Sequence, residues 1–487
     1  MTMKGTQLSL AASAVLCLLL AGCSVGPNYH RPTVTPPPPA YKELTPPPNP
    51  PGGNWKSAQP EDTALKGNWW TIYNDPQLND LEDKIAISNQ TLKAATEQYL
   101  SARESVKYYR SNYYPTLSAG LTGARSRLSY NRPVYFPSAP SQYNDFVLQG
   151  QASWEPDLWG SVRRTVESAS ASAQATAADL ANVELSVRAE LAVDYFEMRG
   201  LDTQQQLLND TVVAYEHYLK LTQIRFKGGV ATESDVALAQ TQLESTRTQA
   251  IDIAVARAQY EHAIATLIGV SASTFSLPEM PLGNSVPAIP AGLPSELLER
   301  RPDVSAAERR VDAANAQIGV AIAAYYPSIV LSGGGGFEAK RPGIWLQGPS
   351  ELWSLGGQAT ELLFDAGRRH AVTQQARDNY GVTVANYRQS VLTAFQEVED
   401  NLAALRILNQ ESTTQDAAVA AAERSLMIST GRYKQGLVNY LEVLTAQTAQ
   451  LTNQRTQASI STRQFVASVQ LIEALGGGWN TSQLPKP

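Results

Sequence analysis

The residues of this 487-residue chain that are most able to do chemistry lie apart from one another. The four histidines are His30, His217, His262 and His370, and their spacing is not that of metal ligands. Gly333–Gly336 could suggest a loop that cradles phosphate, but no Lys-Ser/Thr pair follows it and it lies inside a strand pattern. No nucleophile–base pair is evident. The sequence therefore predicts no enzyme, no metal site and no cofactor.

The charge of the chain argues against a nucleic-acid partner. Lys and Arg number 39 and Asp and Glu number 45, which gives a net charge of −6. The basic residues do not gather on any segment, whereas a surface that binds nucleic acid needs a basic patch.

The N-terminus predicts a lipid-modified cysteine. Lys4 precedes an apolar run that ends in Leu20-Ala21-Gly22-Cys23, and this run is shorter than the ~20 residues that span a membrane. We interpret residues 1–22 as a signal peptide. The small residues before Cys23 resemble a bacterial lipobox, which would make Cys23 the lipidated first residue of the mature chain. The alternative is an ordinary secretory signal that contains a cysteine.

Residues 23–60 form a proline-rich segment. Pro36–Pro39 and Pro46–Pro48 are typical of an extended, stiff chain. We expect a lipid-anchored tether that runs along a protein surface and is unable to pack.

The rest of the chain contains the same pattern twice. Arg225-Phe226-Lys227-Gly228-Gly229 matches Arg432-Tyr433-Lys434-Gln435-Gly436 at an offset of 207 positions, and the match continues without a gap. Repeats of this kind indicate one architecture used twice. We expect a first structural repeat over 61–270 and a second over 271–487.

Long helices are expected in both repeats. No proline lies between Pro156 and Pro278, or between Pro349 and Pro485, and small or apolar residues recur every three or four positions. A helix from Ser161 to Lys227 would be about 100 Å long at ~1.5 Å per residue. Its equivalent is expected over 368–435, and a return helix over 440–475.

Strands are expected where apolar and polar residues alternate, over 115–130, 143–157, 327–341 and 351–365. Each run approaches the ~10 residues that cross a membrane as a tilted strand. The alternative is a soluble sheet with one buried face; the lipoprotein signal favours the membrane. Four strands cannot close a barrel, and open edges are not tolerated in lipid, so several copies must share one barrel. A water-filled lumen needs at least three copies.

Four stretches carry a resemblance to a known family. They are Trp69–Leu78, Glu299–Val304, Tyr325–Pro327 and Glu473–Trp479. In this order they resemble the TolC-like outer-membrane efflux channels, in the lipidated branch that serves resistance-nodulation-division (RND) pumps. The resemblance implies an α+β membrane protein, a homotrimer with a 12-stranded transmembrane β-barrel (four strands per chain) continued by a long α-helical barrel. It also implies that the channel lies in the outer membrane and extends into the periplasm. Its partners would be a periplasmic adaptor and an inner-membrane RND transporter.

The turns after the two long helices hold the most informative polar residues. Gly229 and Gly436 are expected to end these helices, since glycine is common at that position. Thr232–Asp235 and Asn439–Glu442 both have the spacing of a capping box, so both carboxylates are expected to cap the next helix.

The resemblance implies a second role for these turns, as a gate at the periplasmic tip. Tyr433 would hydrogen-bond toward Asp235 and Ser234 to hold the helices shut, and Glu442 would face the pore. The family pattern has a basic residue where this chain has Val438 and a second carboxylate where it has Thr445. A weaker latch and a single carboxylate ring are therefore expected.

Two other functions are compatible with the sequence. A TolC-like channel for protein secretion would share the fold and the gate. A non-conducting, lipid-anchored coiled-coil scaffold would have no barrel.

Overall fold

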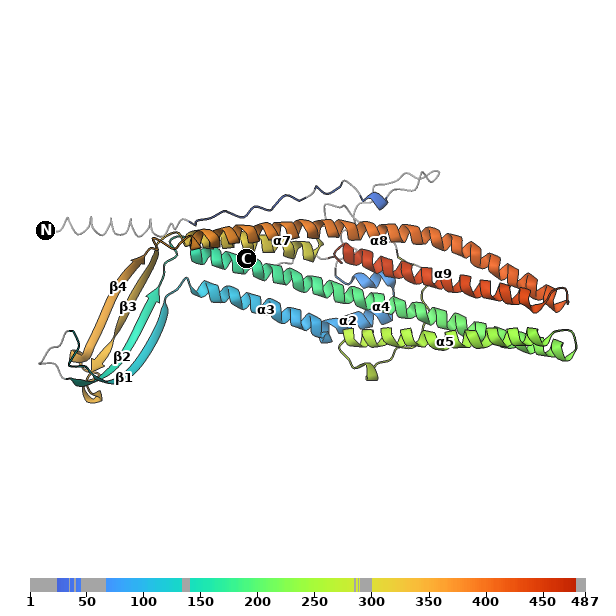
Figure 1. Cartoon of the computed structure of the whole chain (residues 1–487), viewed down its shortest axis with the longest axis horizontal. Coiled ribbons are helices and arrows are strands. Elements are labelled where there is room, and N and C mark those ends of the chain that lie inside the picture. Colours follow the sequence, from blue (N-terminus) through green and yellow to red (C-terminus); the bar gives the residue numbers. More distant parts are fainter. Residues whose placement is uncertain are drawn as a thin grey trace.

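A computed structural model describes residues 24–34, 36–38, 41–44, 67–133, 141–283, 286–287, 289 and 300–478. The molecule is elongated, with a sheet at one end and helices along the rest of its length (Figure 1). Cys23 and the signal segment 1–22 lie outside the described residues.

The sheet holds four antiparallel strands in the order β1-β2-β3-β4. They are β1 (Thr116–Arg127), β2 (Gln142–Trp154), β3 (Ser328–Ala339) and β4 (Glu351–Thr360), and each lies within a segment expected to be strand, except that β2 begins one residue earlier. In the register, Leu121 faces Leu148 and Leu148 faces Phe337. Within the described chain β1 and β4 each have one paired edge, so the sheet has two open edges.

Gly333–Gly336 lie inside β3, as the strand pattern predicts. Close packing explains why position 336 is a glycine, because a Cβ on Gly336 would come within 2.0 Å of the Leu148 carbonyl oxygen on β2. These glycines permit close approach of neighbouring strands and are not a phosphate loop.

The helices repeat in length as well as in sequence. The long helices α4 (Ser161–Lys227) and α8 (Arg368–Lys434) each have 67 residues, and the return helices α5 (Glu233–Leu267) and α9 (Tyr440–Ala474) each have 35. The shorter helices are α2 (Pro76–Ser88), α3 (Gln90–Ser111) and α7 (Pro302–Ala323). Single 3₁₀ turns occur at Lys42–Leu44, Trp69–Tyr73, Ala272–Thr274, Pro342–Ile344 and Gly348–Ser350.

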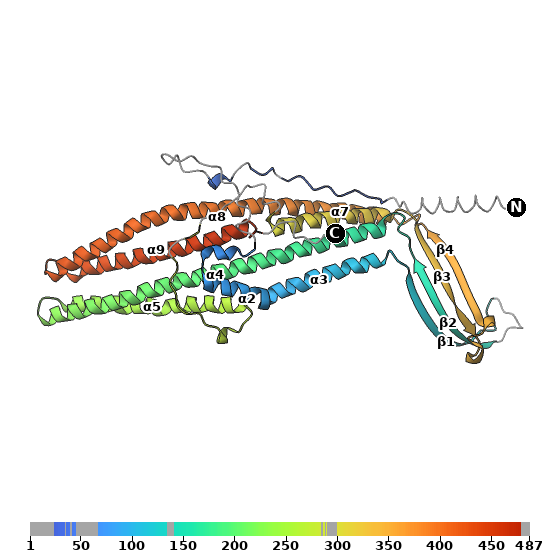
Figure 2. The same cartoon turned by 180° about the vertical axis from the view of Figure 1, so that it is seen from behind.

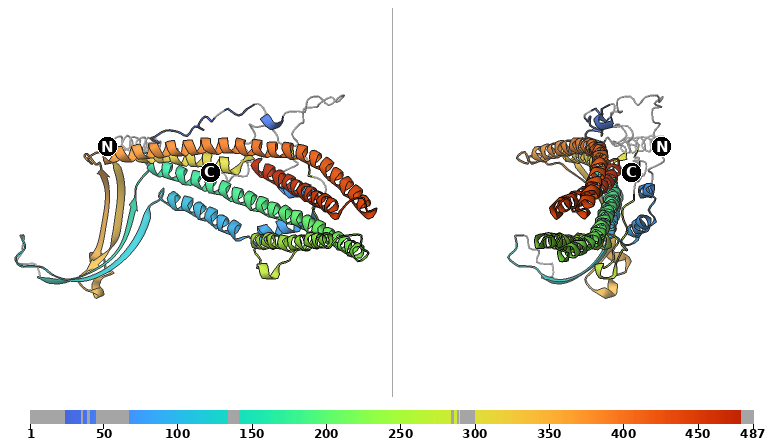
Figure 3. Two further views of the ribbon diagram at one scale, coloured as in Figure 1. Left: turned by 45° about the vertical axis from the view of Figure 1, so that its right-hand side comes forward. Right: turned by 90° about the vertical axis from the view of Figure 1, so that its right-hand side faces the viewer.

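The helices lie side by side in a fixed order. Near the sheet, α4 packs between α3 and α7, and α7 packs on α8. In the half away from the sheet, α4 packs between α5 and α9, and α9 packs on α8 (Figures 2 and 3). None of the described helices combines the length and the apolar character needed to cross a membrane.

In each half, a glycine packs closely against backbone where the return helix ends, and we call this contact a glycine joint. Gly269 and Gly476 both have positive φ (70° and 89°). A Cβ on them would come within 2.3 Å of the Ser88 carbonyl oxygen and 2.2 Å of the Arg300 carbonyl oxygen, respectively. Beside these contacts, Asn89 donates to the Leu267 carbonyl at 2.7 Å and Arg301 donates to the Ala474 carbonyl at 3.1 Å. The joint is therefore duplicated in geometry, with different side chains.

The largest core lies midway along the molecule, where the two halves meet. Tyr73, Phe196 and Phe465 pack there with their rings tilted, and the ring centroids are 4.8 Å apart for Tyr73–Phe196 and for Phe196–Phe465. Leu78, Leu81 and Ile85 of α2 complete it. The Trp69–Leu78 stretch thus seals the junction of the two halves, with Asp75 capping α2.

The described part of the N-terminal segment packs on the helices, which corrects the expectation of a tether unable to pack. It runs along α8 from the sheet end toward the middle of the molecule (Figure 1). Tyr41 is buried against Val398, Leu402 and Leu471. Glu43 pairs with Arg406 at 2.6 Å. Prolines set the extended course of the segment, but the tyrosines between them supply apolar area that the composition argument left out.

Candidate functional site at the tip of the helices

Both helix hairpins turn at the end of the molecule farthest from the sheet (Figure 1). After α4, Gly229 has φ 74°, and Val230 N donates to the Arg225 carbonyl at 2.9 Å. After α8, Gly436 has φ 77°, and Leu437 N donates to the Arg432 carbonyl at 3.0 Å. The two turns share one hydrogen-bond pattern, in which a left-handed glycine closes the helix.

Asp235 caps the helix that follows the first turn. Its backbone N–H donates to Thr232 Oγ1 at 3.2 Å, and its carboxylate accepts from Thr232 N at 2.9 Å. This is a complete capping box, as the spacing predicts. The carboxylate also accepts from the Thr232 hydroxyl, and the neighbouring Ser234 is exposed.

Glu442 does not cap its helix, which corrects the expectation for the second turn. Asn439, at the N-cap position, makes no side-chain capping bond. Glu442 instead pairs with Arg432 of α8, with Arg432 Nη1 2.7 Å from Glu442 Oε1. A half-exposed arginine one helix away provides a charged partner, and a charge-assisted bond is stronger than a neutral one. Spacing alone could not reveal this choice.

Tyr433 is buried between the two hairpins. Its hydroxyl lies 3.5 Å from Thr222 Oγ1 on α4, and its ring meets that of Tyr440 edge-on, with centroids 5.6 Å apart. The described chain thus joins Tyr433 to neither Asp235 nor Ser234, the partners that the resemblance implied. Tyr433 belongs to a small apolar core together with Ala239, Tyr440 and Val443, which holds the hairpins together.

Arg225 forms a second link between the hairpins, which sequence reasoning did not assign. Its guanidinium lies over the Tyr433 ring, 4.6 Å from the centroid, and donates to the Lys434 carbonyl at 3.1 Å. A guanidinium over an aromatic face is attracted by the negative face of the ring. The duplicated Arg-aromatic-Lys segment was the available signal. Nearby, the hydroxyls of Tyr218 and Thr430 lie 3.1 Å apart.

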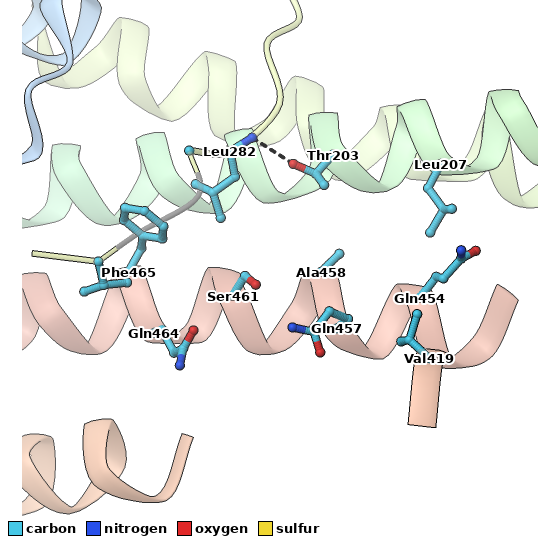
Figure 4. A pocket seen from close by; sticks show the side chains of 12 residues that line it. Thr203, Leu207, Leu282, Val419, Gln454, Gln457, Ala458, Ser461, Gln464 and Phe465 are labelled. Atoms are coloured by element: carbon cyan, nitrogen blue, oxygen red, sulfur yellow. Dashed lines mark hydrogen bonds between the residues drawn. The ribbon is translucent and has the colours of Figure 1, made fainter. Parts of the chain in front are cut away.

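A cavity of about 350 Å³ lies between α4 and α9, nearer the middle of the molecule (Figure 4). Thr203 and Leu207 of α4 line one side, and Gln457 and Ser461 of α9 line the other. The backbone N–H of Leu282 donates to Thr203 Oγ1 at 2.8 Å, so the segment after α5 covers one end. Its lining of hydroxyls, amides and apolar groups carries no charge.

The described residues of the tip are held by ion pairs, aromatic contacts and hydrogen bonds. Among them, no group of three or more His, Cys, Asp or Glu side chains is placed to hold a metal ion. The tip concentrates arginines, tyrosines and carboxylates at helix ends, where their bonds fix how the hairpins approach one another.

Comparison with known proteins shows which family and which relatives this chain is similar to. The family model described as "Outer membrane efflux protein" matches residues 81–270 and 293–477. The toluene efflux pump outer membrane protein TtgF of Pseudomonas putida is 30% identical over 99% of both chains. The pyoverdine export outer membrane protein OpmQ of Pseudomonas aeruginosa is 29% identical over 99% of this chain and 98% of its own.

A solved structure extends the comparison to the fold. The open state of the MtrE outer membrane channel of Neisseria gonorrhoeae superposes with a TM-score of 0.80 at 26% identity, covering 94% of this chain and 99% of that one. The α+β fold class expected from the sequence, with four strands per chain, long helices and internal duplication, is confirmed.

Proposed function

The chain belongs to the outer membrane efflux protein family, and from this premise we propose that it is the outer-membrane exit channel of a tripartite RND-type efflux pump. It conducts small molecules passively to the exterior and carries out no covalent chemistry of its own. The observation that carries the proposal is the four-stranded sheet with two open edges, continuous with helices whose hairpins all turn at the opposite end.

The conducting form is a homotrimer. Open strand edges in lipid leave backbone N–H and C=O groups unpaired, each at a cost of several kcal/mol. Head-to-tail pairing of β4 with β1 of the next copy removes this cost. Three copies give a 12-stranded transmembrane β-barrel wide enough for water, continued by an α-helical barrel.

Small toxic compounds are the proposed cargo. The names of two relatives, a toluene efflux protein and a pyoverdine export protein, describe small-molecule transport. This favours efflux over protein secretion. The partners are a periplasmic adaptor and an inner-membrane RND transporter, because the relatives' names describe components of pumps.

Cys23 is the proposed lipid anchor in the outer membrane. Support comes from Ser24, the next residue. It lies against Gly160, where a Cβ would come within 2.9 Å of Ser24 Cα, and Val25 N donates to the Trp159 carbonyl at 3.2 Å. Gly160 stands between the end of β2 and the start of α4. An acyl chain on Cys23 would therefore lie near the strands that we assign to the membrane.

The tip is the proposed gate, with Ser234, Asp235, Tyr433 and Glu442 at the turns that narrow the tube. Asp235 and Tyr433 act by fixing the two hairpins, through the cap and the buried aromatic contact. Tyr433→Phe combined with Asp235→Ala should raise the resting single-channel conductance of the purified protein. A conductance equal to that of the unmodified protein would mean that these residues only stabilise the turns.

A deletion strain tests the function. Loss of the gene should increase susceptibility to a panel of solvents, dyes and antibiotics, and the full-length gene should restore resistance. A Cys23→Ser gene serves as a comparison for the anchor. Unchanged susceptibility across the panel, with secretion of a protein lost instead, would contradict the proposal in favour of protein export.

A further inference from the structure

The cavity between α4 and α9 has no part in the proposed transport function (Figure 4). Its volume of about 350 Å³ lies in the range of small-molecule sites, about 300–1,000 Å³. One part of its wall is apolar and is formed by Leu207, Leu282, Val286, Val419 and Phe465. The polar part consists of uncharged side chains, namely Thr203, Gln454, Gln457, Ser461 and Gln464.

The polar part of the wall is a row of side chains on α9. Positions 454, 457, 461 and 464 are three or four residues apart, so they share one face of the helix. An amide that donates through its nitrogen keeps its oxygen as an acceptor. Each glutamine of the row donates its Nε2 to a side chain of α8: Gln454 to Glu423 at 3.0 Å, Gln457 to Ser412 at 3.3 Å and Gln464 to Asn409 at 2.9 Å.

The oxygen of the central glutamine lacks a partner. Gln457 Oε1 is buried and accepts no hydrogen bond within the described part of the chain. Most buried polar atoms in folded proteins are hydrogen-bonded, and leaving one unpaired costs free energy. A ligand that donates an O–H or N–H inside the cavity would satisfy this atom.

The first half of the chain shows that the fold does not require these glutamines. At the offset of 207, Gln454 and Gln464 correspond to Arg247 and Arg257 of α5. Their partners on the long helices are equivalent as well, because Glu216 matches Glu423 and Asp202 matches Asn409. In the first half these contacts are ion pairs, at 2.5 Å for Arg247–Glu216 and 2.6 Å for Arg257–Asp202.

The second half therefore makes the same two contacts between helices with amides in place of guanidinium groups. Arginine has five N–H donors and no acceptor, whereas each glutamine adds an acceptor oxygen. The other two positions of the row, Gln457 and Ser461, correspond to Ala250 and Ala254, which have no polar side-chain atom. The acceptors of the cavity are thus particular to the second half.

The lining selects the chemical class of the ligand. Amide oxygens disfavour an anion, and no Lys or Arg is present among the described lining residues. No Asp or Glu lines the described cavity either, so a buried cation would have no opposite charge. The ligand that fits is uncharged, rich in O–H or N–H donors, and apolar on one side. A sugar ring combines these properties, with hydroxyl groups at its edge and C–H groups on its faces.

We propose that this cavity binds an uncharged sugar ring. Its hydroxyl groups donate to Gln457 Oε1 and to the neighbouring amide oxygens, and its C–H face lies on Leu282 and Phe465. Phe465 also packs on Tyr73, with ring centroids 6.2 Å apart, so the site adjoins the core built by the Trp69–Leu78 stretch. On the inner face of the proposed tube this core would obstruct the lumen. The site therefore belongs to the outer face, apart from the transport path.

Calorimetric titration of the purified full-length protein tests the proposal, in a detergent without a sugar headgroup. N-acetylglucosamine should bind saturably. Glucuronate, a ring of similar size that carries a carboxylate, should not bind. Insoluble chitin, a polymer of N-acetylglucosamine, distinguishes two sources of this chemistry. Retention of the protein on chitin would identify a glycan chain as the ligand, and saturation without retention would identify a free sugar.

Two variants test the assigned atoms. Gln457→Met removes the acceptor at similar volume and should weaken the binding of N-acetylglucosamine about tenfold. Gln206→Met, at an exposed position of α4 outside the cavity, is the matched control and should leave binding unchanged. Gln464→Arg combined with Asn409→Asp copies the ion pair of the first half, so the double variant should fold. It should bind the sugar more weakly, because the arginine removes an acceptor and occupies part of the cavity.

No saturable binding of N-acetylglucosamine to folded protein, or equal binding of glucuronate, would overturn the proposal. Equal affinity in Gln457→Met and in the unmodified protein would overturn the assigned acceptor. Conductance of the same samples in planar bilayers tests the transport function separately, and both variants should conduct like the unmodified protein.

Discussion

Glu442 and Asp235 occupy equivalent positions in the two repeats, yet only the Asp235 carboxylate caps its own helix. Glu442 is held by Arg432 and retains acceptor capacity, since a carboxylate has about four lone-pair sites. In the proposed trimer, three such groups would surround one axis and attract cations. Glu442→Gln should therefore reduce cation selectivity, measured as a shift of the reversal potential in a salt gradient. Glu233→Gln, at an exposed position of the other turn, is the control. An unchanged reversal potential would remove Glu442 from the pore.

Glu82 on α2 should make the stability of the folded chain decrease as the pH rises. Burial raises its pKa to about 8, against the opposing effect of Arg188. A carboxyl group whose pKa is higher in the folded than in the unfolded chain takes up a proton on folding. Its contribution to stability is greatest below the unfolded pKa, about 4.3, and is lost as the pH rises toward 8.

Glu82→Gln removes this titration. The melting temperature of the variant in detergent should be close to that of the unmodified protein below pH 4 and exceed it by a few degrees at pH 8.5. A lower melting temperature at pH 8.5 would mean instead that the ionised pair with Arg188 stabilises the fold. Circular dichroism at 222 nm follows the helices in both cases.

At the scale of elements, the duplicated glycine joints should be the least tolerant points of the fold. Gly269→Ala and Gly476→Ala each place a Cβ against backbone oxygen at a positive φ. Since the opposing atoms are backbone, each should cost about 1–3 kcal/mol or more. Gly431→Ala, inside α8 with open space around it, should stabilise by about 0.5–1 kcal/mol. Urea midpoints of folded protein measure both, and tolerance of alanine at either joint would contradict the joint's role.

The sequence predicted elements better than contacts. Proline spacing and periodicity gave α4 its observed ends, Ser161 and Lys227, because helix ends depend on local residues. Packing of the N-terminal segment depends on Tyr41 finding a pocket among Val398 and Leu471, residues more than 350 positions away. Likewise the spacing at Asn439 and Glu442 fits a cap, but Arg432 competes for the carboxylate through the tertiary fold. Non-local partners of this kind leave no signal in local spacing.

At the scale of the whole molecule, duplication supplies both halves of one tube wall, and copies of the chain complete it. The open edges of the sheet and the open faces of α8 and α5 lie on the two sides of the chain, as a ring built head to tail requires. A closed ring leaves no edge, whereas an open chain would continue to add copies.

Conductance of the purified full-length protein in planar bilayers tests the central claim, that this chain forms a conducting outer-membrane channel. Insertion should give discrete, uniform current steps that favour cations, with a low resting level. Protein that associates with the bilayer and is folded by circular dichroism, yet gives no discrete steps, would contradict the claim and favour a non-conducting scaffold.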